Sequence, residues 1–192
     1  GSEMCIRDRV TLTEDCCDLE ECVEKALDIL QPELDQKRLT LQADLSGLRD
    51  KAVCCDSLRF NQILFNLLSN AAKFNRPGGT IWVTLKQTSC AIREYAAYEL
   101  RVKDNGIGMS PEFLAHIFEP FERERSSTIS QTQGTGLGMS ITKNLVDLMG
   151  GSIQVSSELD RGTEFILQFT FKLQAQARQP LSLIHISEPT RP

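Results

Sequence analysis

The stretch between Asp56 and Pro77 constrains the fold most, because its apolar residues recur at helical spacing along one side only. These residues are Phe60, Ile63, Leu64, Leu67, Leu68 and Ala71. The aspartate is a favourable N-terminal cap and Pro77-Gly78-Gly79 ends the pattern, so a helix is predicted over 57–75. Such a helix is stable only when its apolar side is covered, so the rest of the chain must supply a layer on which it packs.

Alternating apolar residues predict that this layer is a β-sheet. Strands are expected over 38–44, 52–55, 80–86, a run that ends at 104, 153–157 and 163–173, the last two joined as a hairpin around 160–162. Two more long helices are expected, one over 18–37 that Pro32 bends or breaks and one that ends at Met149, and a short helix begins at Ser110. Because strands and helices do not alternate strictly, the prediction is an α+β fold, a two-layer sandwich of a mixed sheet on three main helices.

Composition narrows the class of protein. The 192 residues are 41% hydrophobic and 24% charged, the balance of one soluble globular domain. The formal net charge of −5 argues against a nucleic-acid-binding protein, and no apolar run approaches the roughly 18 residues of a membrane span. Seven cysteines include the adjacent pairs Cys16-Cys17 and Cys54-Cys55, which lack the C-x-x-C spacing of a metal site. Small buried thiols in a reducing compartment are therefore expected.

The two ends of the chain differ from the rest. Residues 2–8 and 181–186 can be encoded by DNA strings that are reverse complements over their shared length, which is typical of a sequencing adaptor. We therefore divide the chain into an adaptor-derived tail (1–9), one domain (10–175), and a linker remnant with a second adaptor-derived tail (176–192). Natural neighbouring domains are expected on either side.

A polar stripe runs along the helix predicted over 57–75. Asn66, Asn70 and Lys73 fall within a narrow sector that lies roughly 120° from the apolar side. Amide oxygens beside an ammonium group suit a hydrated Mg²⁺ ion and phosphate oxygens. An ordinary solvated helix surface is the alternative for this stripe.

Two glycine motifs follow. Asp104-Asn105-Gly106-Ile107-Gly108 ends a strand, and Asp104 shares the parity of the inward residues of that strand. A buried carboxylate needs a partner, which the exocyclic amine of adenine can supply, and the glycines allow close approach of the backbone to a ring. The alternative is a turn aspartate that caps its own loop.

The second motif, Gly134-Thr135-Gly136-Leu137-Gly138, enters a helix at its N-terminus, where backbone amides and the helix dipole favour phosphate. It is no P-loop, because no Gly-Lys-Ser/Thr follows, and no strand directly precedes it. The polar segment 126–136 that leads into it is expected to be a mobile lid.

In this order the motifs resemble the histidine-kinase branch of the ATPase superfamily that includes gyrase, the Hsp90 chaperones and the MutL proteins. The resemblance covers roughly 19–173 and implies the Bergerat-type ATP-binding fold. The segments that carry it are an N box at 64–74, a first glycine box at 104–108, an F box at 117–121 (Ile-Phe-Glu-Pro-Phe), a second glycine box at 134–138, and a closing hairpin with Arg-Gly-Thr-Glu-Phe at 161–165.

The resemblance implies ATP and Mg²⁺ as cofactors and assigns roles to single residues. Asn70 would ligate Mg²⁺, with Asn66 and Lys73 at the phosphates, and Asp104 would select adenine with support from Thr163. The other nucleotide-binding residues would be Gly106, Gly108, Phe118, Phe121, Gly134, Thr135, Gly136, Leu137 and Gly138.

Asn66, Lys73 and Arg123 would form the catalytic set, with the arginine reaching the phosphates. Phe118 and Phe121 would anchor the lid, and core packing is the alternative for both. Arg123 also belongs to an alternating run of charges at 122–125, so a solvated charge is its alternative.

The resemblance also bears on the reaction. Hydrolysing relatives such as gyrase carry a glutamate where this chain has Asn66, and an amide cannot act as a general base. The expectation is a protein-histidine kinase domain that transfers the γ-phosphoryl group to a histidine on a separate dimerisation domain, because His116 is expected to be structural and His185 lies in the tail.

The implied partners are that histidine-bearing domain, a response-regulator receiver domain and a second subunit in a homodimer. The domain itself would be cytoplasmic, with an inner-membrane anchor elsewhere in the parent left open. A degenerate nucleotide-gated binding module and a serine kinase of the anti-sigma type are the alternatives.

Overall fold

The computed structural model describes residues 11–120 and 138–175. Its elements are β1 (Asp15–Asp18), α1 (Leu19–Lys37), β2 (Thr40–Asp44), β3 (Ala52–Cys55), α2 (Ser57–Lys73), β4 (Thr80–Thr88), β5 (Tyr95–Asp104), α3 (Pro111–Leu114), α4 (Gly138–Leu148), β6 (Ser152–Glu158) and β7 (Gly162–Leu173). No helix among these is long and apolar enough to span a membrane.

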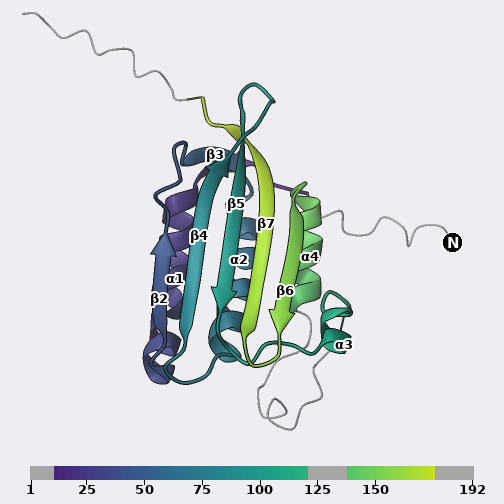
Figure 1. Cartoon of the computed structure of the whole chain (residues 1–192). Coiled ribbons are helices and arrows are strands. Elements are labelled where there is room, and N and C mark those ends of the chain that lie inside the picture. Colours follow the sequence, from purple (N-terminus) through teal and green to yellow (C-terminus); the bar gives the residue numbers. More distant parts are fainter. Residues whose placement is uncertain (1–10, 121–137, 176–192) are drawn as a thin grey trace, which may run out of the picture.

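The strands form one mixed sheet in the order β1-β3-β7-β5-β4-β2, with β6 paired to β7. β2 and β4 run parallel, and the other pairs are antiparallel. The helices α1, α2 and α4 cover one face of this sheet (Figure 1). The predicted two-layer α+β sandwich is confirmed.

The core lies between the two layers. All six residues of the apolar side of α2 are buried, as the periodicity predicts. They meet the inward residues of β5 and β7, where the ring of Phe60 packs edge-on against those of Phe169 and Phe171, with centroids 5.7 and 6.1 Å apart. Burial of these aromatic rings, together with the aliphatic residues of the same side of α2, stabilises the helix–sheet contact.

Several boundaries differ from the prediction. β1 was not expected, because four residues are too few to show a period. β2 begins at Thr40 rather than at residue 38, because Arg38 is a left-handed cap of α1 with φ of 56°. Pro32 neither breaks nor ends α1, which is continuous through it. The α2 helix ends at Lys73, two residues early, with Phe74 as its cap.

The expectation of buried cysteines is only partly right. Cys17, Cys22 and Cys55 are buried, Cys16 is exposed, and Cys54 and Cys90 are half-buried. Adjacent residues of a strand point to opposite faces, so each Cys-Cys pair places one thiol inside and one outside. The described residues contain no cluster that could hold a metal ion, and Cys5 lies outside them.

Candidate functional site

Asp104 ends β5 with its carboxylate inside the molecule. It lies opposite Ile81 of β4 and Thr163 of β7 and is 9% exposed. Burial raises the pKa of Asp104 from its ordinary value to about 6, although backbone amides of Gly106 and Thr163 donate to the carboxylate and lower it in part. The inward direction predicted from strand alternation is confirmed.

The aspartate also caps its own loop, as the alternative proposed. The Gly106 amide donates to Oδ1 of Asp104 over 2.8 Å. The loop is pressed against the end of α2, because the Ile107 amide donates to the Phe74 carbonyl over 3.1 Å and a Cβ on Gly106 would lie 2.4 Å from that carbonyl oxygen. Only glycine fits here, so the loop and the helix end keep one fixed spacing.

Thr163 supports the same row of side chains. Its hydroxyl lies 2.8 Å from Oγ of Ser157 on β6, and that oxygen also accepts from the Met109 amide over 2.9 Å. A row of neighbouring residues therefore crosses β4, β5, β7 and β6, in the order Ile81, Asp104, Thr163 and Ser157. This row lies at the end of the sheet where β5 ends and β7 begins, the lower end in Figure 1.

The predicted polar stripe of α2 is half-buried along its length at Asn66, Asn70 and Lys73. Nδ2 of Asn66 donates to the hydroxyl of Thr142 over 3.2 Å, and that hydroxyl donates to the Gly138 carbonyl over 2.7 Å. Thr142 is fully buried between α2 and α4. The stripe is thereby joined to the first turn of α4, where the second glycine motif ends, and is more than a solvated surface.

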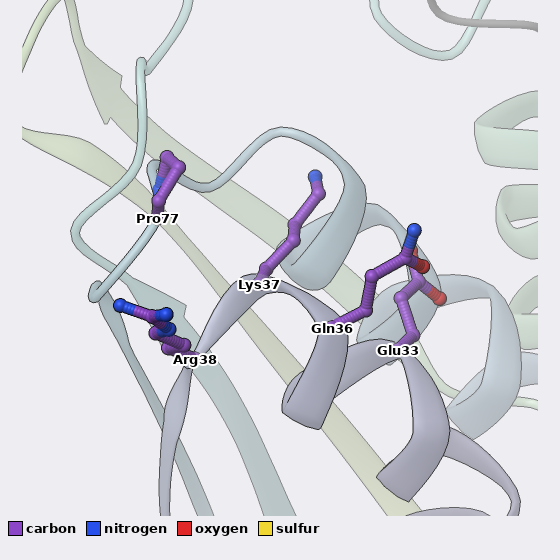
Figure 2. A pocket seen from close by; sticks show the side chains of 5 residues that line it. All are labelled: Glu33, Gln36, Lys37, Arg38 and Pro77. Carbon is purple, nitrogen blue, oxygen red and sulfur yellow. The ribbon is translucent and has the colours of Figure 1, made fainter.

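Lys37 holds the C-terminal end of α2. Its Nζ donates to the carbonyls of Ala72 over 2.9 Å and of Lys73 over 2.6 Å, so a cation sits at the negative end of the helix dipole. Figure 2 shows the Lys37 side chain extending from α1 towards that last turn. It lines an open groove of about 450 Å³ with Glu33, Gln36, Arg38 and Pro77, and none of the predicted site residues that the structure describes lines this groove.

The remaining predicted residues divide between described and undescribed parts of the chain. Phe118 is half-buried and packs against the core, which favours the packing alternative. Gly138 begins α4 with no atom within 4 Å of a would-be Cβ. Phe121, Arg123, Gly134, Thr135, Gly136, Leu137 and the predicted lid lie outside the described residues. His116 is exposed, with Nδ1 2.9 Å from Oε1 of Glu119.

The donors and acceptors present fit a magnesium nucleotide. Among the described groups no charged side chain offsets the burial of Asp104, whose only stabilising contacts come from backbone amides. A carboxylate can accept further hydrogen bonds, so a neutral amine such as that of adenine suits it. Half-buried amide oxygens beside an ammonium group on α2 suit Mg²⁺ and phosphate.

Four residues that support the site were missed from the sequence: Lys37, Asn75, Thr142 and Ser157. Asn75 is buried and donates to the Thr80 carbonyl over 3.2 Å, which holds the turn after α2. Each acts across a long stretch of chain or within a turn, and periodicity carries no signal of such contacts. Only Ser157 shares a strand parity that would have aligned it with Thr163.

The chain is similar to known ATPases. Residues 55–175 match the family "Histidine kinase-, DNA gyrase B-, and HSP90-like ATPase". The autoinducer 2 sensor kinase/phosphatase LuxQ of Vibrio vulnificus is 45% identical over 112 residues, which cover 58% of this chain and 13% of LuxQ. The sensor protein GacS of Pseudomonas syringae pv. syringae is 36% identical over 147 residues, 77% of this chain and 16% of GacS. The chain thus spans less than a fifth of these relatives.

Solved structures agree. Full-length ShkA, in complex with AMPPNP, superposes with a TM-score of 0.68 at 26% identity and covers 87% of this chain and 33% of ShkA. The catalytic domain of the histidine kinase ThkA gives a TM-score of 0.67 at 25% identity and covers 83% of this chain and 95% of that domain.

Proposed function

Since this chain belongs to the histidine kinase-, DNA gyrase B- and HSP90-like ATPase family, we propose that it binds ATP with Mg²⁺ and transfers the γ-phosphoryl group to a histidine on another domain. It is an ATP-binding catalytic domain of the two-component sensor kinase type. The observation that carries the proposal is the buried carboxylate of Asp104 in one row with Thr163, beside the end of the helix that bears Asn66, Asn70 and Lys73.

Each residue has a chemical task in this proposal. Asp104 accepts a hydrogen bond from the adenine amine and Thr163 keeps that end of the sheet polar. Asn70 would hold Mg²⁺ through its amide oxygen, and Lys73 would offer a positive charge to the phosphates. Bound Mg²⁺ would neutralise negative charge on the phosphates. Arg123 and the glycines at 134–138 would complete the phosphate contacts in this proposal.

Transfer rather than hydrolysis follows from Asn66. Activation of a water molecule needs a group that takes a proton, and an amide does not do so near neutral pH. The Nδ2 atom of Asn66 also donates a hydrogen bond to Thr142 of α4, and this bond fixes the orientation of the Asn66 amide. The side chain can therefore position a phosphate or a metal-bound water but cannot generate hydroxide. Charge stabilisation and alignment of the acceptor histidine remain as the means of catalysis.

The proposed partners follow from the proposed reaction. Among the described residues, His116 is exposed and lies next to Glu119 outside the row of site residues, so we propose that the acceptor histidine lies on a separate dimerisation domain of the parent protein. A receiver domain of a response regulator would take the phosphoryl group from that histidine, and the parent would act as a homodimer in a signalling pathway.

Isothermal titration of Mg²⁺-ATP into site variants tests the proposed site. Asp104→Asn replaces an acceptor oxygen by a donor at the adenine position, and Asn70→Asp changes the charge and geometry of the metal position. Both should weaken binding strongly. Asn144→Asp adds the same charge on an exposed position of α4 and should bind ATP like the parent. Parent-like affinity in both site variants would contradict the assignment.

A further inference from the structure

Three thiols meet at the end of the fold opposite to the nucleotide site. Sγ of Cys17 on β1 lies 3.3 Å from Sγ of Cys22 in the first turns of α1. Cys55 at the end of β3 also contacts the thiol of Cys17. All three residues are at most 6% exposed. The proposed nucleotide chemistry assigns no role to this thiol cluster.

The arrangement is specific to the folded chain. Strand alternation turns Cys17 inward, towards Cys22, and turns its neighbour Cys16 outward, where Sγ of Cys16 donates to Gln174 over 2.7 Å. The outward thiol lies opposite Cys54 in the register of β1 and β3. Three other pairings compete with Cys17–Cys22. Cys16–Cys22 is close in sequence, Cys16–Cys54 lies opposite in the strand register, and Cys17–Cys55 is a contact inside the thiol cluster.

We propose that Cys17 and Cys22 are an oxidation site that closes to an intramolecular disulfide and so ties β1 to α1. The oxidant is a low-molecular-weight disulfide. The thiolate of one cysteine attacks a sulfur of this disulfide and releases one small thiolate. The second cysteine then attacks the mixed disulfide and releases the other. The two cysteines lose two electrons and two protons, and the small disulfide is reduced to two thiols.

The fold controls when this reaction takes place. The pKa of Cys22 is raised by the thiol of Cys17 and by burial. The Cys22 contact lowers the pKa of Cys17, but Cys55, burial and the carboxylate of Asp18 outweigh it. Lys25 lowers the pKa of Cys22 only weakly. Neutral buried thiols are poor nucleophiles, so Cys17 and Cys22 are protected from oxidation while β1 stays paired.

Opening of β1 removes this protection. The strand has four residues, and within the described part of the chain it lies at one edge of the sheet and pairs only with β3. Such an edge opens at a lower free energy than the core strands. Oxidation should therefore be slow in buffer and faster in urea concentrations that leave the core folded.

Peptide mapping tests the proposal. The 192-residue chain is incubated with oxidised glutathione, free thiols are alkylated, and the chain is cut after glutamate and after lysine and arginine. The expected product joins peptide 15–20 to peptide 22–24, and fragmentation between Cys16 and Cys17 identifies the bonded sulfur. Opening of β1 admits the oxidant, and the second attack follows when β1 pairs again and Cys17 faces Cys22. The Cys17–Cys22 product should therefore exceed Cys16–Cys22 about tenfold in the folded chain and about equal it in the urea-unfolded chain, where alternation is lost.

Variants provide a second measurement. Cys16→Ala should keep the linkage, and Cys17→Ala should lose it even though Cys16 and Cys22 remain, with far-UV circular dichroism checking that both variants fold. A main product of Cys16–Cys54, Cys17–Cys55 or Cys16–Cys22 in the folded chain would overturn the proposal, as would the absence of any Cys17–Cys22 linkage. The assay does not use ATP, so its outcome is independent of the proposed kinase activity.

Discussion

Replacing Asp104 by asparagine should make the folded chain more stable above pH 6 while it weakens nucleotide binding. Burial raises the pKa of this carboxyl from 3.8 to about 6, so the folded state resists the charged form that the unfolded chain accepts freely. Above pH 6 the carboxylate is charged in both states and the folded state carries the full penalty. Below pH 3.8 both states are protonated and the penalty vanishes.

The size of the effect follows from the shift. About two pKa units correspond to about 3 kcal/mol, since one unit is about 1.4 kcal/mol. Asparagine keeps one acceptor oxygen for the amides of Gly106 and Thr163, so one backbone hydrogen bond is weakened at a cost of about 1 kcal/mol. The variant should therefore be about 2 kcal/mol more stable than the parent at pH 7.5. This advantage should disappear as the pH falls from 6 to 4.

Urea unfolding of parent and variant at several pH values measures this difference. Asp44→Asn is the matched control, because hydrogen bonds from Ser46 lower the pKa of that exposed carboxyl and the sign is reversed. Above the ordinary pKa of aspartate, Asp44→Asn should lower the free energy of unfolding slightly. An Asp104→Asn variant that is less stable than the parent at pH 7.5, or a difference that does not change with pH, would refute the reasoning.

Three further predictions concern the site and the residues that support it. Lys37→Met should lower the free energy of unfolding by about 1–2 kcal/mol in urea titrations, because two carbonyls at the end of α2 lose a charged donor, whereas Lys25→Met, in an exposed pair with Glu21, should leave it within error. Thr142→Val keeps the shape but removes the hydroxyl that holds α2 to α4, so stability should fall by about 1 kcal/mol and Mg²⁺-ATP should bind more weakly in calorimetry, while Thr142→Ser should retain both. The affinity of the parent for Mg²⁺-ATP should fall about tenfold per pH unit below pH 6, where Asp104 takes up a proton, and a flat profile between pH 5 and 7.5 would count against its role at adenine.

Much of the fold could be predicted from the sequence, because the main elements have strong periods. The apolar side of α2 and the alternation of β5 and β7 predicted the helix layer and the sheet layer correctly. The alternation of β5 also predicted that Asp104 points inward. The short strand β1 and the left-handed Arg38 could not be predicted, because a four-residue strand has no period and αL caps are more often glycine.

The site was predicted less completely than the fold. The motif residues on α2 and in the loop after β5 could be recognised because their chemistry is local. The contacts of Lys37 with the end of α2 and of Thr142 with Asn66 join residues 35 or more positions apart. Such contacts depend on how helices pack, and a local sequence pattern does not record them.

The central proposal, phosphoryl transfer without hydrolysis, is tested most directly by following the γ-phosphate of radiolabelled ATP. The chain would be incubated with Mg²⁺ and with the histidine-bearing dimerisation domain that we propose for its parent protein. The label should appear on that domain as an acid-labile, base-stable phosphohistidine, should be absent with Asn70→Asp, and should not be released as free phosphate when the histidine domain is left out. Rapid release of phosphate by the chain alone, or tight ATP binding with no label on the histidine domain, would contradict the proposal.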